Sequence, residues 1–141
     1  NMAEAMPNLI LAKTALEKAL SAKPEVAEYA LQNLAAVYID MGDQAAAISA
    51  LRKLIDKRPN ENFLRYQLGV AYFKNSDFAN SEKSFREAVD RDPTYVAALM
   101  GLGEALIARK NKDVRKIIDR LKPIDANAAA RLDAKARVAR L

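Results

Sequence analysis

The sequence predicts an all-α protein built from stacked antiparallel helix pairs, because it repeats with a period of 34 residues. Leu34, Leu68 and Leu102 stand 34 residues apart, and Pro59 and Pro93 share that spacing. Within each period, apolar residues fall at helical spacing on both sides of a short turn. A fixed period of this length indicates a repeat architecture in which each helix pair covers the apolar face of the next.

The composition excludes several kinds of chemistry. The 141 residues include no Cys, His or Trp, and 23 Lys and Arg stand against 18 Asp and Glu. Without Cys or His there is no basis for a structural zinc site, a disulfide, a thiol nucleophile or a Ser-His-Asp triad. No apolar run approaches the roughly 18 residues that a membrane-spanning helix needs. Nothing in the composition separates a cytoplasmic from a periplasmic location.

We expect five segments within a single domain. In the second helix of the first full period, Leu51 is followed eight residues later by Pro59. Leu16 is followed by Pro24 at the same distance. The chain is therefore expected to open with half a repeat and to be a piece of a longer protein, with Asn1 a remnant of expression. The domain over 1–141 comprises a half-repeat helix over 7–24, repeats over 28–61 and 62–95, a degenerate repeat over 96–122 and a capping helix over 125–140.

Turn formers separate the predicted helices. Asp43 and Asp77 precede second helices and are placed to accept hydrogen bonds from the free amides there. Pro59 and Pro93 follow second helices and prevent their continuation. Each period therefore contains a complete helix, turn, helix unit with its own stop signal.

The helices also have predicted inner faces. A small residue follows each period leucine, at Ala35, Gly69 and Gly103, and would let the paired helices approach closely. In the half repeat, the inward residues are expected to be Leu9, Ala12, Leu16 and Ala19. In the last helix, Ala129, Leu132, Ala136 and Ala139 are expected to face inward, and Arg131, Lys135, Arg137 and Arg140 outward.

Residues 62–95 resemble the tetratricopeptide repeat, whose signature places Leu-Gly, Tyr, Ala, Phe and Pro at set offsets. The matching residues are Leu68-Gly69, Tyr72, Ser81, Phe85, Ala88 and Pro93. Arg65 departs from the pattern, since an aromatic or aliphatic residue is usual at that position. The resemblance extends over about 120 of the 141 residues and implies a right-handed α-solenoid whose first helices line a concave side.

The resemblance also implies which residues face a ligand, and their chemistry is mostly apolar and aromatic. We interpret the groove as a site for an apolar peptide or an amphipathic helix of a protein partner, within a larger assembly. In the alternative interpretation several of these side chains, Phe73 and Ile107 above all, pack between helices instead. The candidate groove residues are Tyr29, Gln32, Asn33, Ala36, Phe63, Tyr66, Gln67, Val70, Lys74, Met100 and Glu104.

One subgroup of the family holds the C-terminal carboxylate of chaperone tails with Lys and Asn on its concave helices. The equivalent sites here carry Gln32, Ala36 and Gly101, which supply no positive charge. The sequence therefore disfavours chaperone-tail docking.

The basic charge is concentrated in the last third of the chain. Residues 1–95 have a net charge of −1, and residues 96–141 have a net charge of +6. This end could dock on an anionic membrane or nucleic acid, although nucleic acid is disfavoured because no aromatic residue lies among the charges to stack bases. The plainer interpretation is a solvated helical face. The densest basic residues are Arg109, Lys110, Lys112, Arg115, Lys116, Arg120 and Lys122.

Two further hypotheses concern self-association and catalysis. The uncovered inward face of the half repeat would allow self-association. Catalysis is disfavoured, because Glu104 has no second carboxylate, metal set or nucleophile beside it, and we expect it to pair with Lys74 or to face water. Gly101-x-Gly103 lies inside a helical stripe and is not a phosphate-binding loop. No cofactor or metal is expected.

Overall fold

The computed structural model describes residues 2–141, so the interpretation of Asn1 lies outside the described residues. Between its turns this part of the chain is helical throughout and contains no strand, which confirms the all-α prediction. None of the helices between residues 2 and 141 combines the length and the apolar content needed to cross a bilayer. The described helices are α1 (Met2–Ala19), α2 (Pro24–Met41), α3 (Gln44–Lys57), α4 (Asn62–Lys74), α5 (Phe78–Arg91), α6 (Val96–Ala108), α7 (Val114–Leu121) and α8 (Ala126–Val138).

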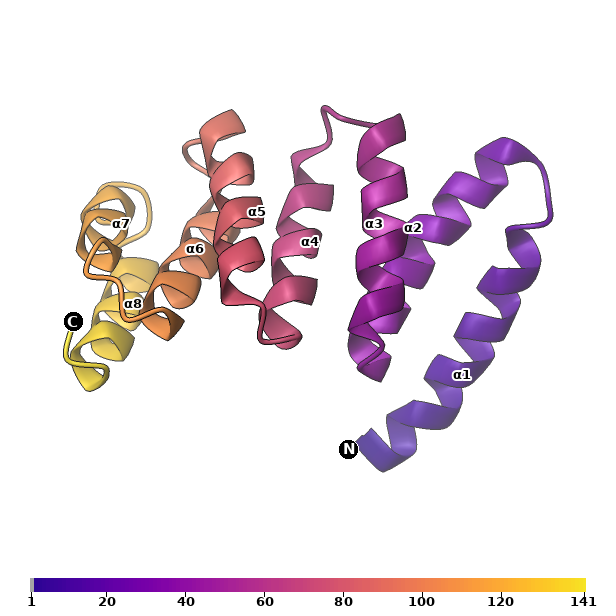
Figure 1. Cartoon of the computed structure of the whole chain (residues 1–141), viewed down its shortest axis with the longest axis horizontal. Helices are drawn as coiled ribbons and strands as arrows, with labels where there is room; N and C mark the ends of the chain where they lie inside the picture. The colour runs from indigo at the N-terminus through magenta and orange to yellow at the C-terminus, as the bar shows by residue number, and fades with distance from the viewer. Residues whose placement is uncertain (1) are drawn as a thin grey trace.

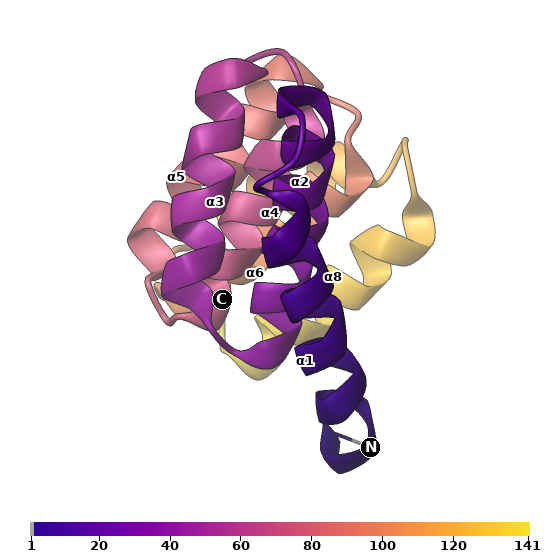
Figure 2. The same ribbon diagram turned by 90° about the vertical axis from the view of Figure 1, so that its right-hand side faces the viewer.

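The helices form a solenoid of antiparallel neighbours. They follow one another in chain order along the long axis of the molecule, from α1 at one end to α8 at the other (Figure 1). Seen along that axis, α3 and α5 lie on one side, and α2 and α8 lie on the other (Figure 2). Beyond chain neighbours, α4 packs against α2 and α6, and α6 packs against α8. One layer therefore consists of α2, α4, α6 and α8.

The helix starts follow the predicted turn chemistry. The Asp43 carboxylate accepts a hydrogen bond from the Ala46 amide at 3.2 Å, and Asp77 accepts one from the Asn80 amide at the same distance. Gly42 ends α2 with a φ of 84°, a left-handed conformation that glycine adopts without steric cost. These short-range signals can be read directly from the sequence.

Two boundaries differ from the prediction. The first helix begins at Met2 rather than at residue 7, and the second begins at Pro24 rather than at residue 28. Pro24, interpreted as the stop of the half repeat, is instead the first residue of α2. Proline is favoured there because the first amides of a helix have no intrahelical partner. The division into repeats stays a prediction.

The buried core is continuous from α2 to α8. One cluster joins α2, α3 and α4, and another joins α5 to α8. Val70, on α4, packs against both clusters. The apolar stripe predicted for the degenerate repeat is buried, at Val114, Ile117, Ile118 and Leu121.

The glycines mark the closest helix approaches. A Cβ on Gly69 would lie 2.7 Å from the Phe85 ring, so α4 and its pair α5 meet as predicted. A Cβ on Gly103 would lie 2.4 Å from Leu132 of α8. The absence of a side chain at Gly103 therefore lets α6 approach α8, the next helix of the same layer. The close approach predicted here was instead between α6 and its pair α7.

Arg65, the departure from the family pattern, is buried and has a structural role. Its guanidinium donates a hydrogen bond to the Pro59 carbonyl at 2.5 Å and lies 3.9 Å from the Glu87 carboxylate. A buried cation is tolerated when it is hydrogen-bonded and paired. Here it ties the turn before α4 to α5.

Candidate functional site

Two adjoining hollows lie between α4, α6 and α8. The first, which we call the distal hollow, has a volume of about 470 Å³ and is lined by Phe73, Glu104, Ile107, Ala108, Ala134, Lys135 and Val138. The second, the central hollow, has a volume of about 480 Å³. Phe73 and Glu104 line both. The central hollow is lined by Tyr66, Val70, Phe73, Lys74, Phe85, Ala97, Met100, Gly101, Glu104 and Arg131.

Five of the predicted groove residues lie together in the central hollow: Tyr66, Val70, Lys74, Met100 and Glu104. A sixth, Phe63, adjoins them, because its ring centroid is 6.2 Å from that of Tyr66. The Phe63 side chain is 47% exposed.

The other predicted residues lie elsewhere. Tyr29, on α2, is 70% exposed and lines neither hollow. The Gln32 side chain accepts a hydrogen bond from Arg58 at 3.0 Å, and the Oε1 atom of Gln67 is buried without a partner in the described residues. Asn33 and Ala36 also line neither hollow. The lining of the distal and central hollows thus comes from α4, α5, α6 and α8.

Phe73 and Ile107 fit parts of both interpretations offered for them. Each is half-buried and packs against the core, as the alternative interpretation expected. Phe73 also meets Phe78 edge-on, with ring centroids 5.1 Å apart. Both side chains nevertheless line the distal hollow.

An aromatic cluster supports the floor of the central hollow. The Tyr66 ring centroid lies 5.9 Å from Phe85 and 5.5 Å from Tyr95. A Cβ on Gly101 would come within 2.5 Å of the Phe85 ring, so glycine allows that ring to sit beneath α6. Burial raises the pKa of Tyr95, and the neighbouring Tyr66 and Asp92 raise it further. This floor is a neutral surface near pH 7.

The charges around the hollows differ from the prediction. Glu104 pairs with Lys135, at 2.6 Å between carboxylate oxygen and ammonium nitrogen, and not with Lys74. The reason is that α8, rather than α4, presents the nearer cation to Glu104. Within residues 2–141, Lys74 and Arg131 form no ion pair, so the central hollow has two unneutralised cations.

Arg131, Lys135 and Val138 of α8 line the hollows but were not among the predicted groove residues. The two cations were expected on the outward face of a capping helix; both are exposed, and each also lines a hollow. The signal was the 34-residue period carried one step further, since Arg131 stands 34 residues after Ala97 and Val138 stands 34 after Glu104. Because α7 is shorter than the other helices, this spacing was difficult to follow in the sequence beyond α6.

Most of the predicted basic patch is neutralised by neighbours. Arg109 pairs with Glu82, which also accepts from Arg86 at 3.0 Å. Burial alone would raise the pKa of Glu82, but the hydrogen bonds from Arg86 and Arg109 outweigh it and lower the pKa. Lys116 pairs with Asp113 at 3.0 Å.

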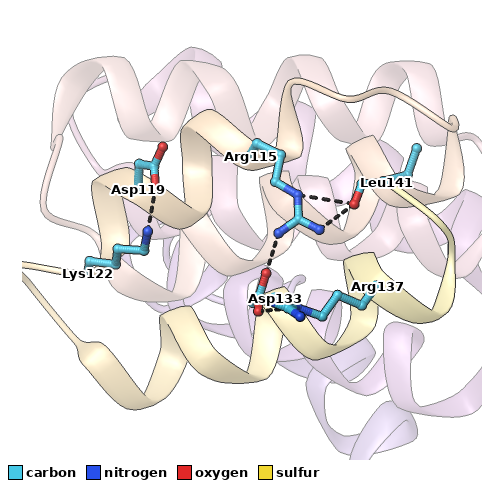
Figure 3. A network of polar contacts seen from close by, with 6 residues as sticks. All are labelled: Arg115, Asp119, Lys122, Asp133, Arg137 and Leu141. Carbon is cyan, nitrogen blue, oxygen red and sulfur yellow. Dashed lines mark hydrogen bonds and ion pairs between the residues drawn. The ribbon is translucent and has the colours of Figure 1, made fainter.

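Figure 3 shows the remaining pairs at the end of the array. Lys122 pairs with Asp119 at 2.7 Å, and Arg115 pairs with Asp133 and donates to the Leu141 carbonyl. Among the predicted patch residues, only Lys110, Lys112 and Arg120 make no ion pair in the described part of the chain. The patch therefore has much less free charge than the sequence count indicated.

Between residues 2 and 141, no group of three or more acidic side chains is placed to hold a metal ion.

Comparison with known proteins agrees with this architecture. Two family models, both described as tetratricopeptide repeat, match residues 29–61 and 66–114, which together make more than half of the chain. The chain belongs to the tetratricopeptide repeat family. Proteins of this family mediate protein–protein interactions, and no catalytic domain is identified here. No curated protein sequence matches the chain significantly.

Solved structures with similar folds share little sequence identity with it. One, described as the first TPR of Spaghetti (RPAP3) bound to HSP90 peptide SRMEEVD, is 24% identical, with a TM-score of 0.70 over 79% of this chain and 91% of that one. Another, MamA 41-end from Desulfovibrio magneticus RS-1, is 20% identical, with a TM-score of 0.73 over 86% of this chain and 67% of that one. A MamA RS-1 ArsTM double mutant is 21% identical, with a TM-score of 0.72 over 93% and 69%. At these identities the likeness concerns the fold alone.

Proposed function

We propose that this protein is a non-catalytic scaffold that binds an apolar or amphipathic segment of a protein partner along α4, α6 and α8, within a larger assembly. One observation carries the proposal: two adjoining hollows with mostly apolar linings lie on a single face of three consecutive layer helices. Apolar surface concentrated in a concavity is the usual character of a binding site.

Two exposed large apolar side chains lie at the same face. Val138 is 87% exposed at the distal hollow, and Phe63 is 47% exposed beside the central one. Burying such side chains under a ligand would contribute about 25 cal/mol for each Å² of apolar area removed from water. A partner with complementary apolar side chains would therefore gain affinity here.

We do not extend the peptide binding of the first TPR of Spaghetti (RPAP3) to this chain. That neighbour is described as bound to an HSP90 peptide. In this chain, Gly101 lies against Phe85, so its position has no room for a side chain that could grip a carboxylate. The proposed groove therefore binds a different class of ligand from a chaperone tail.

The two alternative functions are docking through the basic patch and self-association. Docking on membrane or nucleic acid through the basic patch is weakened, because Arg109, Arg115, Lys116 and Lys122 are paired. Self-association through the first helix stays a prediction. Light scattering over a range of protein concentrations tests it, and a constant monomer mass would contradict it.

The groove is tested with peptides selected from a random display library on the wild-type protein. Ala97→Trp adds a neutral bulky side chain to the central hollow, since Ala97 is exposed and lines it. We expect this variant to lose at least tenfold in affinity for the selected peptides, measured by fluorescence anisotropy. Ala79→Trp, on the exposed face of α5, is the matched control and should bind normally.

A second pair separates the two tyrosines that the sequence placed in the groove. Tyr66→Ala should weaken binding, and Tyr29→Ala should not, because only Tyr66 lines a hollow. Circular dichroism melts confirm that the variants remain folded. Peptides that bind Ala97→Trp and Tyr66→Ala as tightly as wild type would refute the groove.

A further inference from the structure

The central hollow has an asymmetric distribution of charge. Its lining contains two cations, Lys74 and Arg131, and one carboxylate, Glu104. Glu104 is already paired with Lys135, at 2.6 Å. Lys74 and Arg131 are exposed and form no ion pair among residues 2–141. A ligand in this hollow would therefore meet uncompensated positive charge.

The two free cations lie on opposite walls. Lys74 is the last residue of α4, and Arg131 lies in the first half of α8. Between them α6 contributes Ala97, Met100 and Gly101 to the lining. An apolar strip thus runs between two positively charged edges.

This arrangement favours one ligand shape over another. An amphipathic helix can present an apolar stripe with carboxylates on both of its flanks. An extended strand directs alternate side chains to opposite faces, so a strand that inserts apolar residues would direct the intervening side chains away from the hollow. Cations on both walls therefore match a helix better than a strand.

We propose that the segment bound in this groove is an acidic amphipathic helix, whose apolar stripe covers the central hollow and whose flanking carboxylates meet Lys74 and Arg131. This inference rests on the proposed function, because it specifies the chemistry of the partner at the same site. Charge complementarity of this kind determines the choice of partner more than the total affinity.

The inference is tested with three fluorescein-labelled model peptides about five turns long. They share one leucine stripe and differ only in the flanking residues, which are Glu, Gln or Lys. We expect the Glu peptide to bind wild type most tightly and the Lys peptide most weakly, by fluorescence anisotropy. The preference should shrink when salt is raised, since exposed ion pairs are screened.

Two double variants identify the responsible cations. Lys74→Gln with Arg131→Gln should weaken binding of the Glu peptide by about 2- to 30-fold, the range for two exposed ion pairs, and leave the Gln peptide unchanged. Arg52→Gln on α3 with Lys83→Gln on α5 removes the same charge from exposed residues that form no ion pair in the described part of the chain. This control should leave all three affinities near wild type. Reversal to Glu at both groove positions should shift the preference to the Lys peptide.

The outcomes separate this inference from the proposed function. If the groove double variant binds the Glu peptide like wild type while Ala97→Trp does not, the acidic-helix inference is wrong and the groove stands. If neither variant changes binding, both are wrong. A single-stranded oligonucleotide that competes with the Glu peptide, and whose binding is lost in the same double variant, would also overturn it in favour of a nucleic-acid site.

Discussion

The first and last described helices contain similar kinds of residues but are packed very differently. In α8, Ala128, Ala129, Leu132 and Ala136 are buried. In α1, the expected inward residues Leu9, Ala12, Leu16 and Ala19 are only half-buried. Ile10 and Leu11 of α1 are 49% and 69% exposed. The large apolar side chains that α1 leaves uncovered are therefore not the ones that were expected to face inward.

The difference comes from the number of neighbours. The last helix packs against both α6 and α7, whereas α1 packs against α2 alone among the described helices. Burial in a solenoid depends on contacts with adjacent repeats as well as on apolar content. The contact of α8 with α6 also shapes the groove, because α8 contributes Arg131 to the central hollow and Ala134, Lys135 and Val138 to the distal one.

The largest test of this comparison removes a leucine from each end. Leu132→Ala should lower the free energy of unfolding by about 2–5 kcal/mol, because Leu132 is fully buried and leaves a cavity. Leu16→Ala should cost less than about 1 kcal/mol, since its site is only half-buried. Urea unfolding followed by circular dichroism measures both. Equal losses would show that the two ends are equally well packed.

The close approach of α6 and α8 gives a second test. Gly103→Ala would place a Cβ 2.4 Å from one Leu132 methyl carbon and 3.1 Å from its Cγ atom. Overpacking costs about 1–3 kcal/mol and the gain in helix propensity returns about 1 kcal/mol, so we expect a net loss of up to about 2 kcal/mol.

A double-mutant cycle identifies the clash. Gly103→Ala combined with Leu132→Ala should be less destabilising than the sum of the single changes, because the smaller side chain makes room. Strict additivity in the same urea experiment would contradict the contact.

A third, smaller test compares helix starts. Asp125 caps α8 by accepting from the Ala128 amide at 2.9 Å, whereas Lys23 precedes α2 without a side-chain cap. Asp125→Ala should destabilise by about 1 kcal/mol, and Lys23→Asp should stabilise by about 0.5–1 kcal/mol. Thermal melts measure both, and a stabilising Asp125→Ala would contradict the assigned cap.

The smallest expected effect depends on pH. Hydrogen bonds from Arg137 and Arg115 lower the pKa of Asp133 below its ordinary value (Figure 3). A carboxylate with a lowered folded pKa contributes stability above its unfolded pKa of about 3.9, and this contribution is lost as the pH falls through the lower folded value. Asp133→Asn should therefore be less stable than wild type at pH 7. Urea unfolding at each pH measures the difference in stability, which should disappear in strong acid. A difference that persists in strong acid would mean that the substitution acts through packing rather than through the charge.

The sequence by itself determined the helices and their turns. The 34-residue period, the capping Asp43 and Asp77 and the left-handed Gly42 act over a few residues, so they can be read without a partner in space. Five residues of the central hollow were also predictable, because the resemblance to the tetratricopeptide repeat implied their positions.

Only the tertiary structure decided which faces those helices share. Gly103 meets α8, Glu104 pairs with Lys135, and Arg131 enters the central hollow because α8 packs beside α6 as a further member of its layer. The sequence had indicated outward charges on a terminal cap. Helical periodicity tells which residues share one face, but the partner of that face depends on how neighbouring repeats stack, through contacts between residues far apart in the chain.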